Sequence, residues 1–242
     1  VRMASSGSER TADELGRAFP DTRVIVADGD HPVTHVDGRP ALVIATRGAE
    51  PIAEGGYRAV LLLDGERMLL ADDLRIGESC LRWWSNAAAL SAPGAPVHLV
   101  GVTGPVARAL ATWTQPAYAR SELAERAPLH MPPAVRTASV EGTAREVETA
   151  LAALRTDVPG LAGDGGDAIL GPLPRPDDPE VVRALVRFDY PSGRAVAQSL
   201  RASVVAAALR TRRRRDGAAR NGGGAAARNT LKVRLDVVDP EL

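Results

Sequence analysis

With 242 residues, 45% of them hydrophobic and 25% charged, the chain is long enough for two globular domains and has an ordinary folded composition. Its single cysteine, Cys80, excludes an internal disulfide and a cysteine-cluster zinc site within this sequence, and we expect no metal site. No apolar run approaches the roughly 20 residues that cross a bilayer, so we expect a cytoplasmic protein without membrane contact.

The first half of the chain alternates predicted helices and strands. Thr11 and Glu14 have the spacing of a capping box, which predicts that a helix starts there. Two strands are apolar on both faces, as central parallel strands are when helices cover each side. Strands are predicted over 23–27, 41–46, 58–64 and 96–102, and helices over 73–89, 105–112 and on to about 126. This alternation predicts an α/β domain with a mostly parallel sheet over residues 1–130.

The pattern changes at Met131-Pro132-Pro133, which we take as the boundary of a second domain, 131–242. Thr143 and Glu146 form a second capping box, followed by an apolar stripe with helical spacing. Strands are predicted over 135–140, 168–173, 181–190 and 231–237, and helices from Thr143 and over 192–209. The order βαββαβ predicts a small α+β domain.

A net charge of zero hides a basic region near the C-terminus. Residues 201–234 hold nine Arg and one Lys against a single acid, Asp216, which is the electrostatic signature of a polyanion partner. Residues 210–230 combine the Arg run with Gly222-Gly223-Gly224 and are predicted to form a flexible basic loop. The candidate DNA-binding residues are Arg210, Arg212, Arg213, Arg214, Arg215, Arg220, Arg228, Lys232 and Arg234. The alternative is a solvated linker that reflects biased codon use.

Two further groups of residues have open interpretations. Arg183, Arg187, Lys232 and Arg234 occupy alternating strand positions and would share one sheet face, where they either extend the basic surface or are ordinary solvent-facing charges. Trp83 and Trp84 are adjacent on a predicted helix, so at most one faces the core well. We favour core packing for this pair over stacking on bases.

Six stretches in order carry a family resemblance. They are residues 8–20 (SERTADELGRAFP), Asp28-Gly29-Asp30, the strands 41–46 and 60–64, residues 122–126 with 131–133, residues 170–174 (LGPLP) and residues 235–240 (LDVVDP). Together they resemble the C-terminal half of the primosomal protein N′ (PriA) family of replication-restart helicases. The resemblance implies a second RecA-like helicase lobe followed by the family's C-terminal domain.

The helicase motifs of that family are altered in this sequence. The Lys-Gly step of motif V falls on Pro51 and Ile52, and the arginines of motif VI fall on Leu90 and Pro93. An arginine finger contributes roughly 10³ to 10⁵ in phosphoryl-transfer rate, which Leu and Pro do not supply. The family's ATP, magnesium and zinc would be bound by segments absent from this sequence, so we expect no cofactor here. We expect Val1 to begin a fragment or a gene read short.

The resemblance and the basic region together predict a DNA-binding primosome-assembly protein of replication restart, without helicase activity. The resemblance implies forked or single-stranded DNA, single-stranded-DNA-binding protein and other primosome proteins as partners. One alternative is an ATP-dependent 3′→5′ DNA helicase of which this chain is the C-terminal part. Another is a protein-interaction scaffold that does not contact DNA.

Overall fold

The computed structural model describes residues 6–161, 168–220 and 231–237, with the backbone alone at Ser6 and over 214–220. The chain divides into two compact units, Val1–Ala119 and Arg120–Leu242, and each is described by itself. The division falls inside a helix, ahead of the predicted boundary at residues 130 and 131, which stays a prediction. No helix in these described ranges is long and apolar enough to cross a membrane.

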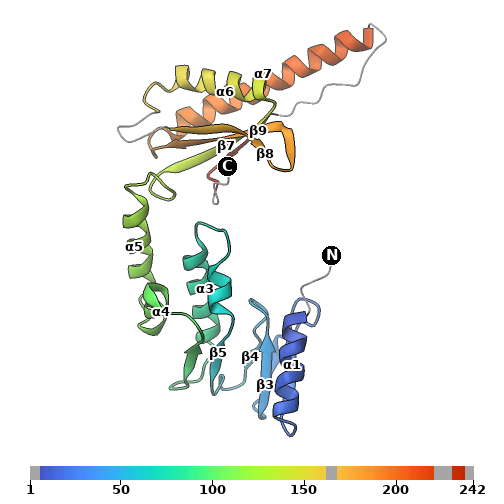
Figure 1. Cartoon of the computed structure of the whole chain (residues 1–242), viewed down its shortest axis with the longest axis vertical. Helices are drawn as coiled ribbons and strands as arrows, with labels where there is room; N and C mark the ends of the chain where they lie inside the picture. The colour runs from blue at the N-terminus through green and yellow to red at the C-terminus, as the bar shows by residue number, and fades with distance from the viewer. Residues whose placement is uncertain (1–5, 162–167, 221–230, 238–242) are drawn as a thin grey trace. The chain divides into compact units, whose positions relative to one another are not determined.

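The first unit is built from short strands that alternate with helices (Figure 1). Its elements are α1 (Ser6–Ala18), β1 (Arg23–Ala27), β2 (His35–Val36), β3 (Ala41–Ala45), β4 (Ile52–Ala53), β5 (Val60–Leu62), α2 (Gly65–Leu69), α3 (Ile76–Ala88), β6 (Val97–Leu99), α4 (Gly104–Ala111) and the start of α5 (Gln115–Arg126). The strands form three parallel pairs: β1 with β3, β2 with β4, and β5 with β6. The α/β class and the parallel pairing are confirmed, although the pairs are not joined into one sheet.

The core of this unit lies between the β5–β6 pair and helices α3 and α4. Leu62, Cys80, Leu81 and Trp84 are buried there together with apolar residues of α4. Trp84 is only 3% exposed, whereas its neighbour Trp83 is partly buried against the same cluster. The expectation that only one of the two tryptophans faces the core well is therefore confirmed.

Two predictions for the first unit are wrong. Helix α1 begins at Ser6, so Thr11 lies inside it and its hydroxyl donates to the Gly7 carbonyl instead of capping the helix. Strand β5 is not covered on both faces, because Leu61 is 61% exposed while its neighbour Leu62 enters the core. An apolar run alone does not reveal that only one of its faces meets helices.

The second unit has the predicted element order βαββαβ. Its elements are β7 (Arg136–Gly142), α6 (Ala144–Asp157), β8 (Ile169–Arg175), β9 (Asp178–Phe188), α7 (Gly193–Arg220) and β10 (Lys232–Leu235). The strands form one antiparallel sheet in the order β10-β7-β9-β8. Helices α6 and α7 pack side by side over one face of it (Figure 1).

Strand register explains which face the helices cover. Val140 pairs with Ala184 on one side and Val233 on the other, so these apolar side chains point to the same face. They pack against Leu151 of α6 and Leu200 of α7 in the core. The predicted helix start at Thr143 is confirmed, since the Thr143 side chain accepts a hydrogen bond from the Glu146 backbone N–H at the start of α6.

The predicted basic loop is wrong over residues 210–220, because α7 continues as a helix to Arg220 instead of ending near Leu209. Arginine and alanine are strong helix formers, and the segment consists largely of them. The rest of the predicted loop, 221–230, with Arg228 and the three consecutive glycines, lies outside the described residues.

Candidate nucleic-acid interface

Helix α7 has a packed half and an exposed half. Val196, Leu200 and Ala207 are buried in the core, and Ala207 is the last buried residue within the described part of the helix. Beyond it, Leu209, Arg210, Arg212 and Arg213 are all exposed. Figure 1 shows this half extending past the end of the sheet. We call residues 208–220 the distal part of α7.

The helical frame fixes the directions of the distal arginines. At 3.6 residues per turn, Arg212 and Arg213 point about 200° and 300° around the axis from Arg210. The three exposed guanidinium groups therefore spread over an arc of about 160°, with Arg213 between Arg210 and Arg212. The distal part, with a rise of 1.5 Å per residue, is about 20 Å long. Arg214, Arg215 and Arg220 lie on the same helical backbone.

Sequence reasoning missed a line of arginines along α7. Arg194, Arg201 and Arg212 are all exposed, and their spacings of 7 and 11 residues place them within about 20° of one line along the helix. The line runs from the packed half onto the distal part. These helical spacings were visible in the sequence, but a helix predicted to end near residue 209 left Arg212 outside it.

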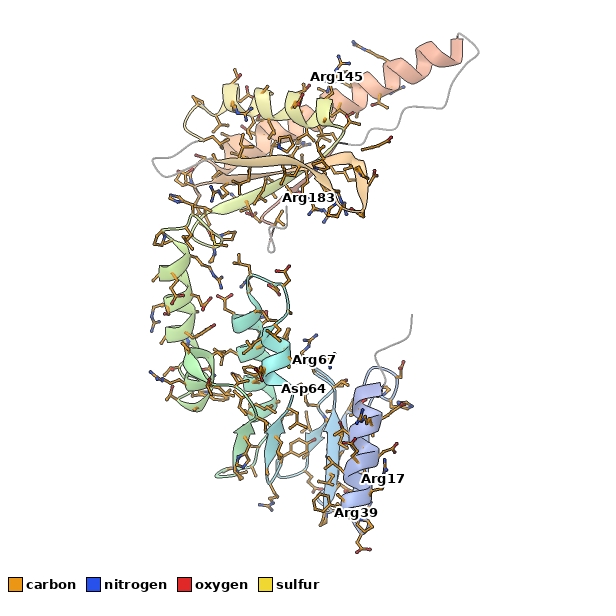
Figure 2. The ribbon with its side chains drawn as sticks, in the orientation of Figure 1. Arg17, Arg39, Asp64, Arg67, Arg145 and Arg183 are labelled. Carbon is orange, nitrogen blue, oxygen red and sulfur yellow. The ribbon has the colours of Figure 1, made fainter. Side chains whose placement is uncertain are left out.

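Lys232 and Arg234 lie on the sheet face that points away from α6 and α7, which we call the open face. The register aligns Lys232 and Arg183 with Glu141, and Arg187 with Thr137. The expectation that the four basic residues share one face is therefore confirmed. Figure 2 shows Arg183 on this side of the sheet and Arg145 on the side of α6.

An ion-pair cluster occupies the centre of the open face. The carboxylate of Glu141 forms ion pairs with Arg183, with Nε 3.0 Å from Oε1, and with Arg175, with Nη1 3.3 Å from Oε2, and Arg175 also pairs with Asp177 at 2.7 Å. The Glu141 side chain is only 7% exposed. Two guanidinium groups thus meet two carboxylates, which leaves the cluster neutral. Arg187 donates to the Leu129 carbonyl, so Lys232 and Arg234 are the exposed cations of the four.

The predicted DNA-binding residues consequently do not form one surface. Those on α7 belong to the helical layer, whereas Lys232 and Arg234 belong to the open face. The helical group is the larger and extends beyond the domain core.

An ion pair fastens the end of β10 to the start of β7. Arg136 donates from Nε and Nη2 to the two carboxylate oxygens of Asp236, each at 2.7 Å, and its guanidinium also lies 5.3 Å from the Phe188 ring centre. The bidentate pairing lowers the pKa of Asp236 below its ordinary value. A side chain at Gly193 would collide with Arg136, so the N-terminus of α7 packs directly on this pair.

The positions aligned with motifs V and VI lie in the first unit, and neither presents a cation. Pro51 is fully buried, and its carbonyl accepts the Tyr57 hydroxyl at 2.7 Å. Leu90 follows the end of α3, where its carbonyl accepts the Tyr57 backbone N–H. The nearby Arg47 guanidinium stacks 3.8 Å from the Trp83 ring centre.

The Asp28-Gly29-Asp30 motif forms a closed turn. The Asp28 carboxylate accepts the backbone N–H groups of His31 and Asp30, and the bond from His31 is the main cause of its lowered pKa. Asp64, which follows β5, occupies the N-cap position of α2 in a left-handed conformation, without a capping hydrogen bond from its side chain (Figure 2). Within the described ranges, no three His, Cys, Asp or Glu side chains gather in a way that could hold a metal ion.

Comparison with known proteins identifies the family. Residues 127–240, nearly all of the second unit, match the family model described as primosomal protein N C-terminal domain. A Mycobacterium tuberculosis protein named "Probable replication restart protein PriA" is 41% identical over 219 residues, covering 84% of this chain and 33% of the relative. The chain belongs to the PriA family. Its counterpart of the same name in Mycobacterium leprae is 40% identical over 211 residues, covering 84% of this chain and 32% of the relative.

The resemblance read from the six sequence stretches is thus confirmed, and the chain corresponds to the C-terminal portion of PriA proteins. It spans about a third of the length of the curated PriA relatives it matches. The similarity to the M. tuberculosis protein covers 84% of the chain and therefore extends well before residue 127. The first unit, with its altered helicase motifs, is thus also similar to PriA proteins.

Proposed function

We propose that this PriA-family chain binds DNA and serves primosome assembly in replication restart without hydrolysing ATP. The observation that carries the proposal is the distal part of α7, where exposed arginines spread over about 160° of a helix that projects from a folded domain. Guanidinium groups bind phosphates bidentately, and the release of condensed counterions favours binding to nucleic acid.

The first unit supports the non-hydrolytic half of the proposal. We assign it to a second RecA-like lobe, because its parallel strand pairs alternate with helices and its sequence aligns with the relatives'. Phosphoryl transfer needs cations aimed at the transferred group. A buried proline at position 51 and apolar residues at Leu90 and Pro93 leave those aligned positions without one.

The relatives' name speaks of replication restart, and the proposed partners follow from it. They are forked or single-stranded DNA, single-stranded-DNA-binding protein and other primosome proteins, in the cytoplasm. Segments of PriA proteins outside this chain would bind ATP, magnesium and zinc, and the proposal requires no cofactor here.

Fluorescence anisotropy with labelled forked DNA at two salt concentrations tests DNA binding. We expect binding that weakens steeply as salt rises, because several phosphates are neutralised at once. Affinity no better than that of an unrelated neutral protein would contradict the proposal and favour a scaffold that does not contact DNA.

A parallel ATPase assay tests the second half of the proposal. We expect no ATP turnover above background, with or without DNA. DNA-stimulated turnover by this chain would instead support the alternative, an ATP-dependent 3′→5′ helicase activity.

A further inference from the structure

The distal part of α7 has the dimensions of a groove-binding element. An α-helix with its side chains is about 10–12 Å across, and the major groove of B-form DNA is about 12 Å wide. The distal part is about 20 Å long and is exposed at Leu209, Arg210, Arg212 and Arg213, so a ligand can reach an arc of about 160° around it.

The arrangement of charge favours a duplex groove, which has a phosphate backbone on each side, over a single nucleic-acid strand. Arg210 and Arg212 point about 200° apart, so their guanidinium groups lie on nearly opposite sides of the helix. A helix lying in a groove has a phosphate backbone on each side, whereas a single strand follows one side only. The sequence of α7 also contains no aromatic residue, and binding of single strands relies on bases stacking on aromatic side chains.

The neighbouring arginines extend the contact toward the domain. Arg194, Arg201 and Arg212 lie close to one line over about 27 Å of helix. When the distal part lies in a DNA groove, the arginines of this line are placed to contact the adjoining phosphate backbone of the DNA. The packed half of α7, held by Val196 and Leu200 in the core, provides the rigid base.

We propose that the distal part of α7 binds double-stranded DNA in its major groove, with arginines on opposite sides of the helix contacting both phosphate backbones. The inference rests on the proposed function, because it names the form of DNA that the chain binds. It assigns the duplex arm of a fork, instead of a single-stranded arm, to this helix.

The geometry also predicts discrimination between duplexes. The major groove of A-form RNA is deep and too narrow for side chains to read, so a helix cannot enter it in the same way. If electrostatic attraction to phosphates alone drove binding, the chain would not distinguish an RNA duplex from a DNA duplex of the same length.

The test measures anisotropy of the full chain with a labelled 20-base-pair DNA duplex, its single strand, and an RNA duplex of matching sequence. The test variant is Arg210→Gln/Arg212→Gln/Arg213→Gln. The control is Arg120→Gln/Arg145→Gln/Arg155→Gln, which removes three exposed arginines elsewhere in the second unit and changes the net charge equally. A third variant, Arg210→Lys/Arg212→Lys/Arg213→Lys, keeps the charge and is expected to keep binding.

We expect the wild-type chain to bind the DNA duplex at least about tenfold more tightly than the other two ligands. The Gln variant should lose about tenfold or more on the DNA duplex, and its plot of log affinity against log salt should be shallower by about 2 to 3. The control should change by less than about threefold. Equal binding of all three ligands, or equal losses in the control and the test variant, would overturn the inference. If the chain still bound forked DNA, the proposed function would stand. Binding to no DNA form would overturn the proposed function itself.

Discussion

Glu141 lies on the open face of the sheet, yet its side chain is almost fully buried between Arg175 and Arg183. Breaking a buried pair by removing one partner is costly, because the remaining charge is left desolvated. The neutral cluster therefore belongs to the structure of the domain, and the basic residues that contact a ligand must be sought elsewhere.

Glu141→Gln should consequently destabilise the second unit by about 3 kcal/mol, since a neutral amide removes the negative charge that pairs with Arg183, whose side chain is only 16% exposed. Urea unfolding followed by far-UV circular dichroism measures the change. Glu148→Gln, at an exposed position of α6, is the matched control and should have little effect. Equal midpoints for the two variants would show that the cluster contributes nothing.

Asp236 predicts a dependence of stability on pH. Its pKa is lowered in the folded state by Arg136, so the pair stabilises the fold above the ordinary Asp pKa of about 3.9, and this stabilisation is lost as pH falls toward the lowered value. We expect Asp236→Asn to be less stable than wild type at about pH 6, with the difference shrinking toward about pH 3. Asn tolerates the left-handed backbone at this position, φ 53°, as Asp does. A difference in urea midpoint that stays constant with pH would contradict the ion-pair explanation.

Among the elements, α7 combines a well-packed half with a half that has little tertiary support. Arg210 and Arg213 are three residues apart on the distal part, and like charges at this spacing destabilise a helix. Ala207 is the last core contact in its described part, so the distal turns depend on backbone hydrogen bonds and helix propensity.

Raising the salt concentration should therefore increase the helix content of the wild-type chain. Screening at about 0.5 M salt weakens repulsion between exposed arginines, and the circular dichroism signal at 222 nm should become more negative than at about 0.02 M. In Arg210→Gln/Arg212→Gln/Arg213→Gln the change should be clearly smaller. A wild-type signal that does not respond to salt would mean that repulsion does not limit the helix.

Elements with clear periodicity were predictable from the sequence, and those decided by context were not. Thr143 was recognised as a cap because an apolar stripe follows it, and the βαββαβ order followed from strands and helices of ordinary length. The same capping pattern at Thr11 failed, because the helix already starts at Ser6 and has Glu9 in its first turn. For the arginine run, charge and the neighbouring glycines favour a loop, whereas helix propensity favours the helix that the structure contains.

The candidate site was only partly predictable for a related reason. Alternation along the strands placed Arg183, Arg187, Lys232 and Arg234 on one face. It did not reveal that Glu141 neutralises Arg183, because that pairing depends on which strands are neighbours. Sheet order is a long-range property, and a single sequence carries little information about it.

The whole chain contains two compact units, each with its own hydrophobic cluster. Such units commonly unfold independently. The three tryptophans, Trp83, Trp84 and Trp113, all belong to the first unit, whereas helices of both units contribute to circular dichroism.

Urea unfolding followed by these two probes should therefore give curves that do not coincide. Tryptophan fluorescence should report a single transition of the first unit, and circular dichroism should show an additional change at a different urea concentration. Glu141→Gln should shift only the additional change. Superimposable curves would indicate that the two units unfold cooperatively.

Because α7 projects far from its packed half, a small tilt of the helix moves its far end by a large distance. With about 20 Å of helix beyond Ala207, a tilt of about 10° at the base displaces the tip by about 3.5 Å, close to the axial spacing of about 3.4 Å between successive phosphates of one strand. The small side chain of Ala207, only 1% exposed, lies where the packed half of α7 ends. Substitutions at Ala207 would change the direction of the helix tip without changing any charge, so core packing one to two turns before Arg210, Arg212 and Arg213 sets their positions.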